Sequence, residues 1–194
     1  MILHHYAGKT LSADDPLRYA VEVSPWTPVE DLRTATLWRG VIVGAWGSVE
    51  TALKEIALRA SRCESFAPLD ARIPNSRGDL IEYLRLVLTD PGPLSAVASE
   101  LKILVDGYEA SAEHRNLLAH AHMSVLPNWP VIFKTFQAKR DKLNGDHFSY
   151  SEIKLTIEQL DGIALLATQL SRAAQILRDH IDEHGYLPKF DQCA

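Results

Sequence analysis

The segment from Thr27 to Arg62 constrains the fold most, because it predicts one long helix that must be buried on more than one side. Thr27 and Glu30 have the spacing of a capping box, and Pro28 occupies the first helical position, where its missing N–H is not needed. Apolar residues then recur almost all round the helix, including Leu32, Ala35, Val41, Ile42, Val43, Trp46, Val49, Leu53 and Ile56. A helix of this kind belongs at the centre of a helical domain.

Three glycines, Gly40, Gly44 and Gly47, lie four and three residues apart on the same helix. Each costs the helix about 1 kcal/mol relative to alanine. We therefore expect another helix backbone to approach this helix closely at the glycines.

The rest of the chain predicts more helices and one hairpin. Helical periods run over residues 79–88, 95–123 and 156–184, and the last has a capping box at Thr156 and Gln159 and Gly185 as its expected C-cap. Residues 129–152 alternate with a period of two on either side of Asn144-Gly145, which predicts a β-hairpin. We therefore expect an all-α fold, a long-helix up-and-down bundle with a small β-hairpin insertion at 129–152. Residues 1–26 show no sustained period and are expected to be a loosely structured N-terminal arm before one helical domain, 27–194.

The composition is that of one globular domain. The chain has 194 residues, of which 46% are hydrophobic and 23% charged, with a net charge of -5. The net charge of the chain therefore does not attract nucleic acid or a membrane surface. An anionic partner would have to bind a local cluster of positive charges. Two cysteines form no disulfide framework, the N-terminus lacks a signal sequence, and the most apolar window, 37–49, is too short to span a bilayer. We expect a cytoplasmic protein without a membrane partner.

One short stretch, residues 113–122, concentrates the chemistry of the chain. It contains Arg115, Asn116, His120 and His122. On an ideal helix of about 100° per residue, Asn116 and His120 lie about 40° apart, whereas Arg115 and His120 lie about 140° apart. Either the helix loosens here, or Arg115 and His120 act across an interface, or His122 is the partner of Arg115. A fifth polar residue, His114, is expected to face elsewhere on the surface.

The run Arg115-Asn116-Leu117-Leu118-Ala119-His120 resembles the Arg, polar residue, then His motif of the HEPN superfamily, in which four to six residues separate Arg from His. Both His120 and His122 meet that spacing, and the resemblance extends over about residues 28–184. Many members have Gly after the His, where this chain has Ala121. The resemblance implies a metal-independent endoribonuclease in which two copies of the motif meet across a homodimer interface. Toxin–antitoxin and defence proteins are the types of protein it suggests.

The roles that the resemblance implies are chemically reasonable. His120 would act as the base that takes the proton of an RNA 2′-hydroxyl, and Arg115 would clamp the phosphate as negative charge develops. Asn116 would orient His120 or bind the phosphate, and His122 is a second candidate acid or base. Glu50, an acid in the first long helix, would support Arg115. An antitoxin or regulatory protein that holds the activity off is left open.

Each of these residues also has a plain structural interpretation. Arg115 and Glu50 could form a buried ion pair without catalysis, and Asn116 with His120 could be an ordinary polar pair one turn apart. The chain would then be a non-catalytic helical dimer that binds a protein or a nucleotide. His120-x-His122 has no nearby residues that complete a metal site, and the sequence has no GxGxxG or Walker loop, so we expect neither a metal nor a cofactor.

The predicted hairpin carries a local excess of positive charge. Lys134, Lys139, Arg140 and Lys142 alternate with aromatic residues, as in a strand platform where bases stack and cations follow phosphates. The alternative is a hairpin with one packed aromatic face and one solvated charged face. On the first interpretation these four residues bind RNA.

Overall fold

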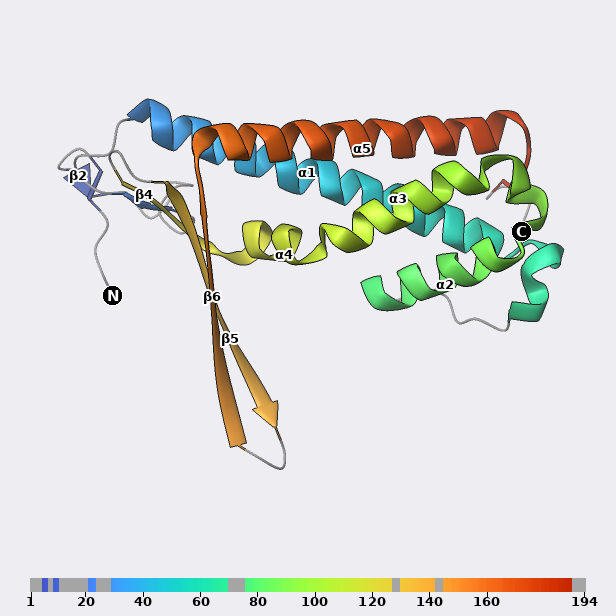
Figure 1. Ribbon diagram of the computed structural model, residues 1–194, viewed down its shortest axis with the longest axis horizontal. Coiled ribbons are helices and arrows are strands. Elements are labelled where there is room, and N and C mark those ends of the chain that lie inside the picture. The colour runs from blue at the N-terminus through green and yellow to red at the C-terminus, as the bar shows by residue number, and fades with distance from the viewer. Residues whose placement is uncertain are drawn as a thin grey trace. The chain divides into compact units, whose positions relative to one another are not determined.

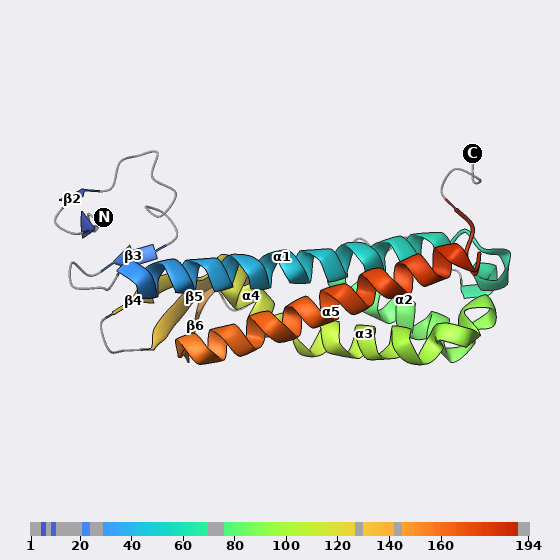
Figure 2. The same cartoon turned by 90° about the horizontal axis from the view of Figure 1, so that it is seen from above.

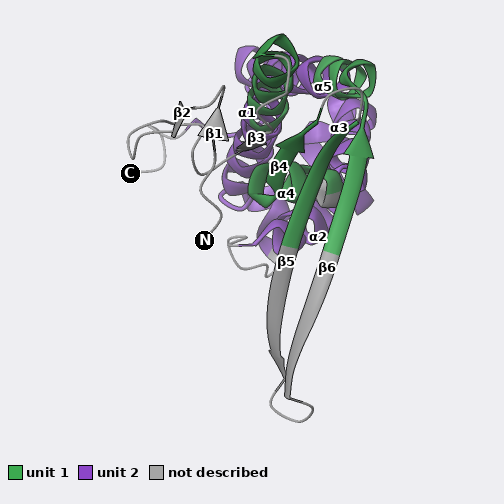
Figure 3. Cartoon of the chain, turned by 90° about the vertical axis from the view of Figure 1, so that its left-hand side faces the viewer, with its two compact units in different colours: residues 1–43, 113–165 green, residues 44–112, 166–194 purple. Residues whose placement is uncertain are grey.

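A computed structural model of the chain describes residues 5–6, 9–10, 21–23, 29–69, 76–126, 130–141 and 145–189. The fold is mainly helical with a small β-sheet (Figure 1), which confirms the predicted class in its coarse form. The chain divides into two compact units, residues 1–43 with 113–165 and residues 44–112 with 166–194 (Figure 3). We call them unit 1 and unit 2 and describe each by itself.

The helices agree with the periodicity of the sequence at most positions. They are α1 (Val29–Ala60), α2 (Arg77–Thr89), α3 (Ala98–Ala110), α4 (Ala112–His120) and α5 (Ile157–Glu183), with 3-10 helices at Glu64–Leu69 and Gly92–Val97. At the start of α5 the Gln159 N–H donates to Thr156 Oγ1 at 3.2 Å, and the Thr156 N–H donates to the Gln159 side chain at 2.9 Å. That capping box was predicted. The box predicted at Thr27 lies outside the described residues, because Thr27 and Pro28 are not among them.

The single helix predicted over 95–123 is wrong. α3 ends at Ala110, where the Ser111 hydroxyl donates to the Tyr108 carbonyl at 2.9 Å and breaks the helical period. α4 ends at His120, and the chain then forms strand β4 (His122–Val125). Met123, the last residue of the predicted helix, and Val125 beyond it are buried from this strand instead.

The hairpin is confirmed and belongs to a larger sheet. Strands β5 (Val131–Asp141) and β6 (Gly145–Leu155) pair antiparallel from Val131↔Leu155 to Asp141↔Gly145. Their connection, residues 142–144, lies outside the described residues. The strand order is β3-β4-β5-β6, with β4 antiparallel to β5 and β3 (Val21–Val23) parallel to β4.

The N-terminal arm thus contributes a strand, although no period in residues 1–26 predicted one. Two further short strands, β1 (His5–Tyr6) and β2 (Lys9–Thr10), pair with each other. A three-residue strand such as β3 is too short to leave a recognisable alternation in the sequence.

Unit 1 has a core between helix and sheet. Its fully buried members include Leu32 and Ile42 of α1, Leu118 of α4, Phe133 of β5 and Leu160 of α5. Because α4 and β4 follow one another directly, this core holds both sides of the turn that carries the motif.

Unit 2 is helical. Gln175 Nε2 donates to Ser48 Oγ at 3.1 Å, and further along the same two helices Arg59 binds Asp182. The unit 2 portions of α1 and α5 therefore run in the same direction, as Figure 2 shows.

The close approach predicted at Gly40, Gly44 and Gly47 is wrong. A Cβ built at any of the three would meet no described atom within 4 Å. Nothing in the structure explains these glycines.

Within the described part of the chain, no helix combines the length and apolar character that crossing a membrane requires.

Candidate functional site

The turn between α4 and β4 is held by one side chain from α1. Arg39 Nε donates to the Leu118 carbonyl at 2.7 Å, and Nη2 donates to the carbonyls of Ala119 and Ala121 at 3.3 and 2.9 Å. All of these residues belong to unit 1. A helix leaves its last four carbonyls without partners inside the helix, so the guanidinium occupies the place of a C-terminal cap.

The position of Arg39 is also electrostatically favourable. The C-terminal end of a helix carries a partial negative charge, which a cation stabilises. Burial lowers the pKa of the Arg39 guanidinium from its ordinary value, because desolvation disfavours the charged form. The three carbonyls replace water around the cation. Arg39 therefore fixes the backbone between His120 and His122.

A pocket of about 570 Å³ lies between α4 and the hairpin strands of unit 1. Its lining residues are His114, Asn116, Leu117 and His120 from α4, Thr135 from β5, and Ser151, Glu152 and Ile153 from β6. Among them, His114, Asn116 and His120 are exposed to solvent. The volume is in the range of small-molecule sites, and it combines two imidazoles, an amide, two hydroxyls and a carboxylate.

The pocket brings together two of the predicted site residues, Asn116 and His120. His114, which was expected to face elsewhere, also lines it, because the pocket is open and extends along more than one face of α4. Arg115 is half-buried on the same helix and is not among the described residues that line the pocket. The helical path from Arg115 to His120 is continuous, so their side chains leave α4 about 140° apart.

The other predicted site residue of the motif, His122, is the first residue of β4. It stands opposite Lys134 in the register, and Lys134 stands opposite Glu152. Residues directly opposite on neighbouring antiparallel strands share a face of the sheet. His122, Lys134 and Glu152 therefore form one row across three strands, and the Glu152 end of the row reaches the pocket.

One of the four cations that were predicted to bind RNA forms an ion pair with a carboxylate of the same sheet. Glu152 forms ion pairs with Lys134 at 3.8 Å and with Lys154 at 3.1 Å, so the Lys134 ammonium has a carboxylate beside it already. Lys139 and Arg140 lie on β5, in register with His147 and Asp146, and their side chains lie outside the described part of the structure. Lys142 lies outside the described residues altogether.

Glu50, the predicted support for Arg115, belongs to unit 2, whereas Arg115 belongs to unit 1. On α1, the Lys54 ammonium, one turn further along, donates to Glu50 Oε1 at 2.7 Å and forms an ion pair with it.

The residue that the sequence analysis missed is Arg39. Its signal was a lone cation within the apolar window 37–49, since a charge in such a place requires specific partners.

Comparison of the chain with models of known families, with curated proteins and with solved structures gives no match.

Proposed function

We propose that the chain is a metal-independent endoribonuclease of HEPN type, which cleaves RNA at a composite site formed by two copies of the motif. The observation that carries the proposal is the pocket in unit 1, where the exposed His120 and Asn116 stand beside the hydroxyls and carboxylate of the hairpin. A phosphodiester with its flanking nucleosides fits a volume of this size.

In the proposed reaction, His120 removes the proton of a ribose 2′-hydroxyl. The 2′-oxygen then forms a bond to the adjacent phosphorus as the bond from phosphorus to the 5′-oxygen breaks. A second imidazole returns a proton to the leaving 5′-oxygen, and the products are a 2′,3′-cyclic phosphate and a 5′-hydroxyl. His122 and the partner copy's motif are the candidates for this acid. Arg115 would bind the phosphate oxygens, and Asn116 would orient His120.

The geometry of α4 favours two copies over one. Arg115 and His120 leave the helix about 140° apart, so one copy directs only His120 into its pocket. An arginine from a second copy supplies the missing cation. Exposed apolar side chains offer a dimer surface of the kind predicted through the long helices: on α5, Leu166 is 65% and Ile176 is 59% exposed.

The experiment is an RNA cleavage assay on the purified full chain with single-stranded RNA in EDTA. We expect cleavage with 2′,3′-cyclic phosphate ends, and a loss of at least about 100-fold in His120→Ala and in Arg115→Ala. His184→Ala and Arg172→Ala are matched controls, because both residues are exposed in unit 2. Their cleavage rates should equal that of the wild type.

Three results would overturn the proposal. Cleavage that survives both motif substitutions would place the activity elsewhere, and wild-type protein that cleaves no RNA would favour the non-catalytic dimer that binds a protein or nucleotide. Dependence on Mg²⁺ would contradict the metal-independent mechanism. Size-exclusion chromatography with light scattering measures the expected homodimer.

A further inference from the structure

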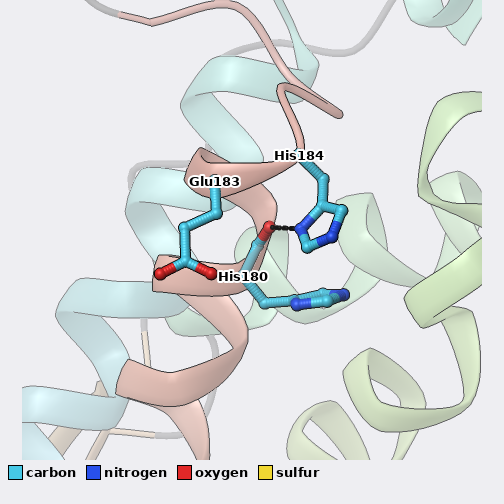
Figure 4. Close-up of side chains that lie close together, drawn as sticks. All are labelled: His180, Glu183 and His184. Carbon is cyan, nitrogen blue, oxygen red and sulfur yellow. Dashed lines mark hydrogen bonds between the residues drawn. The ribbon is translucent and has the colours of Figure 1, made fainter.

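The last turn of α5 gathers three side chains that are typical metal ligands. His180, Glu183 and His184 each offer one ligand atom, and these atoms all lie within 4.8 Å of one another. Figure 4 shows the three side chains leaving the same turn of the helix. All three belong to unit 2, and none is part of the motif in unit 1. We propose that this cluster is a binding site for a borderline divalent cation, with Zn²⁺ as the expected ion.

The ligand set selects this class of metal. Two imidazoles and one carboxylate suit Zn²⁺ and its neighbours in the first transition row, whereas Mg²⁺ and Ca²⁺ prefer oxygen ligands throughout. Residues three and four positions apart share one face of a helix, which is why His180, Glu183 and His184 meet. A fourth, open position would be taken by water.

The orientation of His184 is fixed by the backbone. Its Nδ1 lies 3.0 Å from the His180 carbonyl oxygen, drawn as the dashed line in Figure 4. A carbonyl accepts, so Nδ1 carries the proton and Nε2 keeps its lone pair for a metal. A hydrogen bond from the second ring nitrogen to a backbone carbonyl is the usual support of a metal-binding histidine.

The end of α5 is rigid where the cluster forms. Gly185 adopts a φ of 62°, and the Tyr186 N–H donates back to the Ile181 carbonyl at 3.2 Å, as in a Schellman motif. The Tyr186 ring consequently stacks on His184, with ring centroids 5.4 Å apart and 20° between the planes. His180 touches the same ring edge-on at 5.9 Å. The Tyr186 ring therefore limits the orientations of the two imidazoles.

The charges around the cluster favour a cation. The C-terminal end of α5 carries a partial negative charge. Asp179 and Asp182 already bind Arg178 and Arg59, whereas Glu183 has no ion pair among the described residues.

The distances between the three ligand atoms must shorten slightly before the atoms can bind one Zn²⁺. Ligand atoms around a tetrahedral Zn²⁺ stand about 3.4 Å apart, and those of the cluster lie within 4.8 Å of one another, so no separation has to close by more than about 1.4 Å. Glu183 is exposed, so its side chain can rotate towards the two imidazoles without disturbing the core. The prediction from sequence was that no residue binds a metal, and this proposal departs from it.

The test is equilibrium dialysis of tag-free, chelator-treated full chain against Zn²⁺, with the visible spectrum of the Co²⁺-loaded protein as a second readout. We expect one Zn²⁺ per chain and a tetrahedral Co²⁺ spectrum. Loss of an outer-shell partner lowers metal affinity about 10- to 100-fold, so loss of a ligand in His180→Ala, His184→Ala or Glu183→Gln should weaken binding by at least that factor. Mg²⁺ and Ca²⁺ should not compete.

Controls separate this site from other histidines and from thiols. His114→Ala, His120→Ala and the double variant Cys63→Ser/Cys193→Ser should bind Zn²⁺ as the wild type does. Wild-type protein that binds no Zn²⁺ at micromolar concentration would overturn the proposal. Stoichiometric binding that persists in His180→Ala/His184→Ala, or that disappears with the thiols, would overturn it as well. Because cleavage is assayed in EDTA, failure of the nuclease proposal leaves this result unaffected.

Discussion

Arg39 Nη2 lies 2.9 Å from the carbonyl oxygen of Ala121, the residue that separates His120 from His122. The same guanidinium caps the carbonyls of Leu118 and Ala119, so one side chain of α1 holds the backbone where α4 ends and β4 begins. His120 stands on the helix side of this contact and His122 on the strand side.

Removal of this cap should destabilise the fold. Hydrogen bonds to a charged group contribute about 1.5 to 3 kcal/mol each, and we expect Arg39→Ala to lower the free energy of unfolding by about 2 to 4 kcal/mol, measured in urea. Arg39→Lys should retain part of it, because an ammonium cannot reproduce the guanidinium fork. Arg33→Ala is the matched control: its pair with Glu30 is on the surface and should contribute less than about 0.5 kcal/mol. Equal losses at both positions would contradict the assigned role.

A second arginine performs the same kind of task in unit 2. Arg59 is 2% exposed, binds Asp182, and donates to the carbonyls of Pro188 at 2.9 Å and Leu187 at 3.1 Å. Its removal leaves a carboxylate and two carbonyls without their partner.

We expect Arg59→Met to cost about 3 to 5 kcal/mol, or to prevent folding at 37 °C. Thermal unfolding followed by circular dichroism measures this loss. Lys54→Ala, which removes an exposed ion pair on the same helix, should shift the midpoint little. A stable, fully folded Arg59→Met protein would show that the segment after α5 is held by other contacts.

Removal of the capping box of α5 should lower the free energy of unfolding by less than the loss of either arginine. Thr156→Ala removes the acceptor for the Gln159 N–H and should cost about 1 kcal/mol, whereas Thr156→Ser keeps the oxygen and should cost much less. Urea unfolding of the two variants side by side measures the difference. If serine and alanine behave alike, the hydroxyl does not act as a cap.

The structure also predicts a dependence of stability on pH. The pKa of Asp106 is lowered, first by its hydrogen bond with Lys102 and then by the nearby charges of Lys102 and Arg85. A carboxyl whose pKa is depressed in the folded state adds stability that is fully present above its unfolded value of 3.8 and is lost as pH falls towards the folded value. Asp106→Asn should therefore unfold at lower urea concentration than the wild type at pH 7, and the two midpoints should converge below about pH 4. A constant difference across this range would assign the effect to something other than the charge.

The sequence predicted the helices and the hairpin better than the connections between them. Thr156, Gly185 and the apolar periods are local signals, and the structure has α5 and the hairpin where they indicated. Residues 95–123 were misassigned because the apolar helical period continues across Ser111 to Leu118, and only the pairing of Met123 with Phe133 of β5 shows that the chain then forms a strand. Such pairing is a long-range contact without a local signal.

The candidate site was also predictable only in part, because some of its residues have a local signal in the sequence and others depend on long-range contacts. Asn116 and His120 stood out by their density in the sequence, whereas the roles of Arg39 and Glu152 depend on segments far away in the chain. The pattern His180-x-x-Glu183-His184 was visible in the sequence, and a search for histidines and acids three and four residues apart would have found it.

A composite site makes a prediction that a one-copy site does not. If Arg115 of one copy acts with His120 of the other, a dimer of one Arg115→Ala chain and one His120→Ala chain retains one intact combination: the arginine of the second chain with the histidine of the first. Each variant alone retains none. Mixing the two inactive proteins under conditions of subunit exchange should therefore restore up to about half of the RNA cleavage per mixed dimer, which rests on the proposed two-fold assembly. Native mass spectrometry counts the mixed dimers in the same sample. Mixed dimers without cleavage would mean either that the acid is the partner copy's His120, which the mixed dimer lacks, or that both residues must come from the same copy. In the second case the 140° between them on α4 would have to be closed by a change in the helix itself.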